Sequence, residues 1–301
     1  MFDLIGFGAV AIDHLMYVDA FPPPNVKTYV IRSEQQCGGL TATALVAAQR
    51  LGAQCAYAGT LGHDDGSNFA LEVMQREGID VSHVVFRENA GPIRAAVIVG
   101  LDRATRNIFP EHPAIAGAAD DQPDASVIRA SKVVFVDHLG MAGMIRAATI
   151  ARDAGIAVVC DVERDLPNFE ALLALVDHVV MSEDFALQLT HATQPEAATR
   201  ALWTPARALV AVTYGEQGCY FTEDGETVWH QPAFKVEAID TTGCGDVFHG
   251  AYAAALAKGM PAAERIRFAS AAAALKATQR GGQAGAPTLA QVETFLRSAK
   301  L

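Results

Sequence analysis

The sequence predicts an α/β fold of three layers, in which helices cover both faces of a mainly parallel central sheet. Apolar runs of strand length, such as KVVFVDHLG (132–140) and IAVVCDV (156–162), show no polar alternation. Such runs are typical of parallel strands that are buried on both faces. Alanine-rich runs of helix length stand between them, and this alternation favours strands joined by crossover helices.

In the first third of the chain, LIGFGAVAI (4–12) is predicted as one strand and CAYAGTLG (55–62) as strand-like. Helices are predicted over TATALVAAQRLG (41–52) and NFALEVMQREG (68–78). Each ends in glycine, which readily adopts the left-handed backbone that closes a helix.

The same alternation continues to the end of the chain. The predicted strands are the two runs quoted above, HVVMSE (178–183), ALVAVTYG (208–215) and GCYFTEDGETVWHQPA (218–233). The predicted helices are GMIRAATIARDAG (143–155), DFALQLT (184–190), VFHGAYAAALAKG (247–259), AERIRFASAAAALKAT (263–278) and LAQVETFLRSA (289–299).

Two segments, 14–36 and 93–113, interrupt this pattern with β-rich stretches broken by polar residues and prolines. We expect them to pair into a small sheet that stands off the main body as a lid over an active site. The remaining residues, 1–13, 37–92 and 114–301, would then form the core. The alternative is two ordinary surface hairpins.

The composition limits the class of protein. Of the 301 residues, 51% are hydrophobic and 19% are charged, which is enough to build a sizeable core. The net charge of −11 argues against nucleic-acid binding, which needs basic patches. No apolar run is long enough to span a membrane, and no signal peptide is recognisable, so we expect a cytoplasmic protein without a membrane partner. The five cysteines are scattered without metal-ligand or disulfide spacing, which fits a reducing compartment.

The stretch DTTGCGDVFHG (240–250) comes directly before and into a predicted buried helix. Glycine amides at a helix N-terminus, together with the helix dipole, favour binding of an anion. Asp246 on the first turn would repel that anion, but it could act as a base for a nearby hydroxyl group. The alternative is that Asp246 only caps the helix.

The run GFGAVA (6–11) resembles a dinucleotide-binding fingerprint, which requires a helix after the glycines. Here the chain continues as strand and is then broken by prolines 22–24, so an NAD-dependent dehydrogenase is disfavoured. Asp13 at the end of this strand could accept two hydroxyl hydrogen bonds from a polyol, or it could simply be a turn residue.

Two motifs, CGGLTATALVAAQRLGA (37–53) and DTTGCGD (240–246), resemble the two signatures of the ribokinase-type (PfkB) carbohydrate kinases, and the resemblance extends over essentially the whole chain. Within this family, HQPAFKVEAIDTTGCGDVFHGA (230–251) and RFASAAAALKAT (267–278) are most similar to kinases of 6-deoxy-6-sulfofructose. The resemblance implies a ribokinase-like fold and transfer of the γ-phosphoryl of ATP to a primary hydroxyl of a ketose or related sugar, sulfofructose included. A nucleoside kinase of the same family and a sugar-binding regulator without catalysis are the alternatives, and the intact GCGD disfavours the regulator.

The resemblance also implies roles for individual residues. Asp246 would be the catalytic base, and Gly243, Cys244 and Gly245 would offer backbone amides to the transferring phosphoryl group. Cys244 stands where the family usually has alanine, and it would contribute through its backbone. The nucleotide would be bound by Ser182 and by residues of VTYGEQG (212–218), namely Thr213, Gly215 and Gly218.

Metal binding is implied less directly. Members of the family often bind K⁺ beside the anion site, and the matching positions here are Asp240, Thr242, Ala277, Arg280 and Gly282. The alternative role for Asp240 is to fix the following turn by side-chain hydrogen bonds. The Asn-x-x-Glu motif that organises Mg²⁺ is replaced by SEDF (182–185), so Mg²⁺ would arrive mainly with ATP.

The sugar would be bound by Asp13, Gly38, Gly39 and Thr43, with Lys27 reaching in from the first lid segment. His138 stands where the sulfofructose kinases have arginine, and Thr43 stands where the family has asparagine. A guanidinium suits a sulfonate better than an imidazole does, so we expect a sulfosugar to be a poorer substrate than some uncharged or carboxylated sugar. The lid is also expected to pair two subunits, because apolar strand edges need covering.

Overall fold

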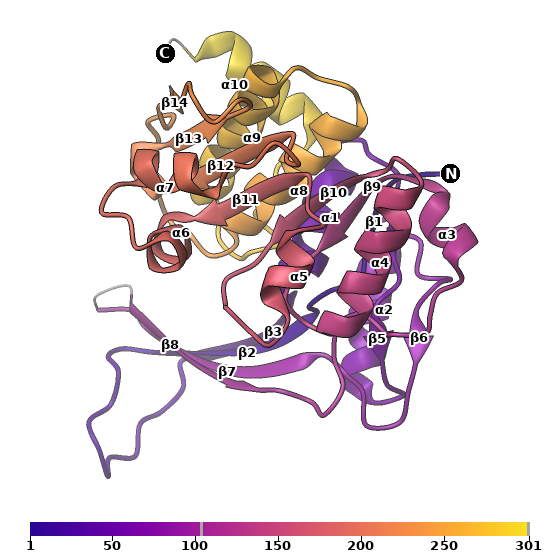
Figure 1. The fold of residues 1–301 in the computed structure, drawn as a ribbon. Coiled ribbons are helices and arrows are strands. Elements are labelled where there is room, and N and C mark those ends of the chain that lie inside the picture. Colours follow the sequence, from indigo (N-terminus) through magenta and orange to yellow (C-terminus); the bar gives the residue numbers. More distant parts are fainter. Residues whose placement is uncertain (103–104, 300–301) are drawn as a thin grey trace.

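The computed structural model describes residues 1–102 and 105–299 and confirms an α/β fold of three layers (Figure 1). Its central sheet has eight strands among the described residues. The six from β4 to β12 run parallel to one another, β13 is antiparallel to β12, and β14 is antiparallel to β13. In spatial order the strands are β4 (Cys55–Tyr57), β1 (Phe2–Gly6), β9 (Ser131–Val136), β10 (Ala157–Asp161), β11 (His178–Ser182), β12 (Leu209–Thr213), β13 (Cys219–Thr222) and β14 (Trp229–Gln231).

Helices cover both faces of this sheet because successive strand residues point to opposite sides. Val133 and Phe135 belong to one buried cluster, whereas Val134 and Val136 belong to the other. The first cluster includes α1 (Leu40–Arg50), α2 (Asp65–Arg76), α8 (Cys244–Ala257), α9 (Ala262–Ala277) and α10 (Leu289–Ser298). The second includes α3 (Ala125–Arg129), α4 (Met141–Asp153), α5 (Phe169–Leu173), α6 (Glu183–Thr190) and α7 (Pro195–Leu202).

A second, four-stranded sheet, here called the lid sheet, extends away from this body (Figure 1). Its strands, in spatial order, are β3 (Arg32–Gly38), β2 (Ala11–Val18), β7 (Ile93–Gly100) and β8 (Thr105–Glu111). The two segments predicted to interrupt the fold therefore pair with each other, through parallel strands β2 and β7. The first lid segment is slightly longer than the predicted range 14–36, because β2 already begins at Ala11 and β3 ends only at Gly38.

The prediction of a single strand over 4–12 is wrong, because a turn between Gly6 and Ala11 separates β1 from β2. At Gly8 the backbone passes so close to Asp137 that an added Cβ would lie 1.9 Å from its Oδ2. The amide of Ala9 then donates to the same oxygen at 2.5 Å. A strand follows the turn, so the helix of a dinucleotide fingerprint is absent here.

The run 55–62 also divides, into β4 and the short strand β5 (Thr60–Leu61), which pairs with β6 (Val85–Phe86). Between them the Tyr57 hydroxyl donates to the Gly8 carbonyl at 3.0 Å and lies where a side chain at Gly59 would be. These contacts bend the chain out of the central sheet. No helix among the described residues is both long enough and apolar enough to cross a membrane.

Candidate active site

Helix α8 packs on strands β1, β9 and β10 in the interior of the central sheet, and its first residues follow a sharp turn. Gly243 caps the helix with a left-handed backbone, φ 76°. A Cβ at this position would lie 2.9 Å from the Cα of Gly282, so the turn packs directly against a neighbouring loop. Both the conformation and the close approach require glycine. We call residues 240–246 the helix start.

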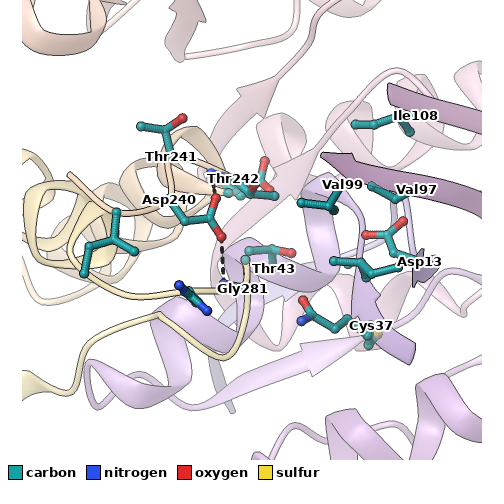
Figure 2. A pocket seen from close by; sticks show the side chains of 18 of the residues that line it. Asp13, Cys37, Thr43, Val97, Val99, Ile108, Asp240, Thr241, Thr242 and Gly281 are labelled. Carbon is teal, nitrogen blue, oxygen red and sulfur yellow. Dashed lines mark hydrogen bonds between the residues drawn. The ribbon is translucent and has the colours of Figure 1, made fainter. Parts of the chain in front are cut away.

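The helix start lies between two cavities. The first, of about 470 Å³, is lined by Gly243 and Asp246 together with the lid sheet and the loop 280–282 (Figure 2). The second, of about 720 Å³, is lined by Cys244 and Gly245 together with the end of β12 and helix α9. Two ligands could thus meet across the first turn of one helix, with the carboxyl group of Asp246 on one side and glycine amides on the other.

Asp246 is half-buried and lies on the first cavity. Removal from water raises its pKa well above the usual range, and the carboxyl group of Asp161 adds to this effect. His249 opposes it with a lowering influence. A carboxyl group with a raised pKa is a better proton acceptor than an ordinary aspartate, which is what a general base requires.

The His249–Asp161 pair was not predicted from the sequence. His249 Nδ1 lies 3.4 Å from Asp161 Oδ2 and 2.8 Å from the carbonyl oxygen of Gly245. Its Nε2 lies 3.1 Å from the carbonyl oxygen of Val180 in β11. The pair therefore connects the first turn of α8 to two strands of the sheet. The histidine three residues after Asp246 is the one signal in the sequence that could have indicated this pair, but nothing there indicated Asp161 as the partner.

Asp240 holds the turn before the helix. Its Oδ1 accepts from the Thr242 amide at 2.8 Å and its Oδ2 from the Gly281 amide at 2.8 Å (Figure 2). Although burial alone would raise it, these hydrogen bonds keep the pKa of Asp240 below its usual value. The turn-fixing role that the sequence left open for Asp240 is therefore present in the structure.

On the first cavity, the structure brings together four of the residues predicted to bind a sugar, namely Asp13, Gly38, Gly39 and Thr43. Gly39 has φ 95°, and a Cβ there would lie 2.6 Å from the Ala9 carbonyl oxygen, so the β3–α1 junction also requires glycine. Beside Asp13, the lid carries an apolar part of the lining (Figure 2). It consists of Leu15 in β2, Val97 and Val99 in β7, Leu101 directly after β7, and Ile108 in β8.

Two of the predicted sugar-binding residues are not part of this lining. Lys27 is exposed on the loop between β2 and β3, which extends away from the body (Figure 1). His138, two residues after the end of β9, is buried, and its Nδ1 has no hydrogen-bond partner within the described part of the chain. Among the described residues that line the cavity, Arg280 is the one with a permanent positive charge.

On the second cavity lie Thr213, Gly215 and Gly218, from the end of β12 and the short 3₁₀ helix η1 (Gly215–Gln217). Small residues of α9, among them Ala273 and Ala274, form a flat wall. Ser182 pairs with Thr213 in the sheet register but does not line the cavity.

The SEDF run is partly unsuited to metal binding, because Phe185 is buried and stacks edge-on against Phe169 at 5.6 Å between ring centroids. Glu183 and Asp184 lie in the first turn of α6, and burial together with Asp184 raises the pKa of Glu183. No cluster of three histidine, cysteine or acidic residues suited to a metal occurs in the described ranges.

The positions predicted for a monovalent cation are divided between the cavities. Asp240, Thr242, Arg280 and Gly282 line the first cavity, whereas Ala277 lines the second.

Residues 1–289 match the family model described as pfkB family carbohydrate kinase. The chain is 27% identical to a ribokinase of Haemophilus influenzae, with 97% of each chain covered, and 27% identical to fructokinase-1 of Zea mays, with 98% of each covered. Among solved structures, a putative ribokinase from Agrobacterium tumefaciens superposes with a TM-score of 0.91 at 30% identity, covering 98% of this chain and 97% of that one.

Proposed function

Because the chain belongs to the pfkB family of carbohydrate kinases, we propose that it transfers the γ-phosphoryl group of ATP to a primary hydroxyl of an uncharged ketose or related sugar. The observation that carries this proposal is the position of the helix start between two cavities. Asp246 faces the cavity that holds Asp13 and Thr43, and Gly245 faces the cavity of Thr213.

In this proposal the sugar occupies the first cavity with its primary hydroxyl at Asp246. The carboxylate takes the hydroxyl proton as the oxygen attacks phosphorus. The backbone amides of Gly243, Cys244 and Gly245, at the positive end of the α8 dipole, stabilise the charge on the transferred group. When bound with ATP, Mg²⁺ would neutralise phosphate charge. Glu216 lines the second cavity together with Thr213, and Glu183 and Asp184 begin α6 directly after Ser182, which pairs with Thr213 in the sheet.

The lining of the first cavity supports a neutral sugar. Asp13 offers a carboxyl group to hydroxyls, and the polar floor around Gly38 and Thr43 suits a polyol. A sulfonate would need a cationic partner, yet neither Lys27 nor His138 lines the cavity. The permanent cation among the described lining residues is Arg280, which lies two residues before Gly282 and so belongs to the loop that packs against the helix start. Relatives named ribokinase and fructokinase are consistent with a neutral substrate.

A nucleoside is the second candidate substrate, because one wall of the first cavity is apolar. Val97, Val99 and Ile108 would contact a nucleobase better than they would contact a hydroxyl group. A regulator without catalysis is less well supported, because a binding module has no need of a base at Asp246.

We also propose that the protein is a homodimer joined through its lid. The loop between β2 and β3 carries exposed apolar side chains, among them Tyr29 and Ile31. Apolar side chains gathered on an extended loop favour a protein partner. Light scattering at micromolar concentration should give twice the monomer mass, and Ile31→Asp should give the monomer. A native protein that remains monomeric would contradict pairing through the lid.

The activity is tested with ATP, Mg²⁺ and a panel of ketoses, aldoses, sulfosugars, sugar acids and nucleosides, with ADP release and product mass as readouts. We expect a phosphorylated neutral sugar. If a sugar raises the melting temperature but no member of the panel is phosphorylated, the regulator interpretation replaces this one.

A further inference from the structure

Lys276, in the last turn of α9, is fully buried although it carries a charge. Its Nζ donates to the carbonyl oxygen of Asp240 at 2.7 Å and to that of Gln279 at 3.1 Å. The side chain passes Gly285, where an added Cβ would lie 3.0 Å from the Lys276 Cδ. Burying an ammonium costs free energy unless it is hydrogen-bonded and paired with an opposite charge, so the Lys276 ammonium needs a negative charge nearby.

The compensation comes from Asp240. The ammonium contacts the backbone carbonyl oxygen of Asp240 itself, and its positive charge helps to lower the pKa of the Asp240 carboxyl group. The same carboxylate accepts the amide of Gly281 at 2.8 Å. The ammonium and the carboxylate together therefore tie the turn at 240–242 to the loop at 279–282.

These two segments position the helix start. Gly243 approaches the backbone of Gly282 so closely that no side chain fits between them. A shift of the loop at 279–282 would therefore move Gly243 and the amides that follow it. They are also the segments that contain most of the positions at which the sequence suggested K⁺.

We propose that Lys276 is a positioning residue whose ammonium serves as a built-in monovalent cation, so that the enzyme needs no added K⁺. An ammonium and K⁺ carry the same charge and both favour oxygen ligands, and here the cation is attached covalently to α9. The inference rests on the proposed kinase activity, because it assigns the helix start to phosphoryl transfer.

The native enzyme provides the first test. Its initial rate with ATP and Mg²⁺ is compared in potassium, sodium and tetramethylammonium chloride at equal ionic strength. We expect the same rate in all three salts, because the position of the ammonium is always filled. Clear stimulation by potassium over both other salts would overturn the inference.

Substitution of the lysine provides the second test. Lys276→Met should lower kcat by on the order of 10–100-fold, the scale of a small displacement of catalytic groups. Potassium or ammonium ions should restore part of this activity in the variant, whereas tetramethylammonium, which is too large to enter, should not. Lys276→Gln, which keeps a donor without the charge, provides a second variant if the methionine protein folds poorly. An activity loss that no small cation restores in either variant would overturn the inference.

Lys258→Met is the matched control. Lys258 lies just beyond the other end of α8 and also donates to a backbone carbonyl oxygen, that of Leu51, at 2.7 Å. Its loss should lower the melting temperature without making the enzyme sensitive to potassium. If Lys258→Met becomes equally sensitive, the effect is general and the inference fails.

A thermal readout separates this inference from the proposed function. Potassium should raise the melting temperature of Lys276→Met more than sodium does. The native protein should have the same melting temperature in both salts. This measurement needs no turnover. A native protein that phosphorylates nothing would therefore contradict the kinase proposal, whereas identical melting of Lys276→Met in both salts would contradict the role of Lys276.

Discussion

The helix start and the lid sheet border the same cavity but are held in opposite ways. At the helix start, Asp240 binds two backbone amides, Gly243 packs on Gly282, and His249 contacts two carbonyl oxygens. In the lid, Leu101 directly after β7 and Ile108 in β8 line the cavity while 52% and 50% of their surfaces remain exposed. Groups fixed from several sides suit chemistry that depends on position, whereas a lightly packed wall can adapt to the substrate.

Removal of the proposed base is the most direct test of whether the fixed helix start carries the chemistry. Asp246→Asn keeps the size of the side chain but cannot accept the hydroxyl proton, so kcat should fall by roughly 10²–10⁴-fold. The melting temperature should stay the same or rise, because a carboxyl group whose pKa is raised by burial destabilises the folded protein when it is charged, and asparagine removes that charge. Steady-state rates with the best sugar of the panel check this. Near-native turnover would show that Asp246 only caps the helix.

The two ends of α8 offer a matched pair of glycine substitutions. Gly243 and Gly259 both have left-handed backbones, with φ 76° and 73°. Alanine at either site should cost about 1 kcal/mol of folding free energy through backbone strain. Only Gly243→Ala also pushes against Gly282, whereas nothing lies within 4 Å of a Cβ at Gly259.

We therefore expect Gly243→Ala to lose on the order of 10–100-fold in kcat, because the proposed phosphoryl-binding amides would shift. Gly259→Ala should keep native kcat at a temperature where it is folded. Urea unfolding and initial rates on both variants check this. Equal kcat in the two variants would show that the position of the helix start is not critical.

Asp161 and His249 have opposite effects on the pKa of Asp246, so their substitution should shift the pH dependence of the rate in opposite directions. The acid limb of kcat/KM reports the pKa of the free base, because protonated Asp246 cannot accept a proton. Asp161 raises that pKa, so Asp161→Asn should move the acid limb to lower pH. His249 lowers it, so His249→Gln should move the limb to higher pH. Glu163 and Asp137 also act on Asp246, and they stay unchanged in both variants.

Rates measured across the acid range with saturating ATP check this pair. Shifts in the same direction would mean that the substitutions act through structure rather than through charge. An unmoved limb in both variants would mean that another group, and not Asp246, controls the limb.

The helix start was predictable from the sequence because its signal is local. Glycines, Asp240 and Asp246 stand within one short stretch, and the helix that follows is obvious from its alanines. The two lid segments were recognisable because they break a regular alternation. Contacts between distant segments were not recognisable. The break at Gly8 depends on Asp137, and the neighbourhood of Asp246 depends on Asp161, which lies on another strand.

The specificity residues show the same limit. Lys27 and His138 were assigned to the sugar by matching positions along the sequence, but position in the sequence does not fix where a loop extends. The loop that carries Lys27 has no strand partner to hold it against the cavity. Asp137 Oδ1 accepts a hydrogen bond from the Leu139 amide at 2.8 Å, and this local contact fixes the backbone on both sides of His138.

The smallest expected effect concerns the lid and tests this last point. Lys27 is exposed and does not line the first cavity, so Lys27→Ala should leave kcat/KM for the best neutral sugar unchanged. It should also leave the ratio of kcat/KM for sulfofructose to that for the neutral sugar unchanged, because no contact to a sulfonate is lost. Ile108→Ala is the comparison variant, since it alters the lid wall itself and should raise KM for the sugar while leaving kcat nearly unchanged. If the native enzyme prefers sulfofructose and Lys27→Ala abolishes that preference, the loop must close over the cavity when substrate binds. The lid would then select for charge as well as for shape, and the contrast between a fixed helix start and an adaptable lid would become sharper.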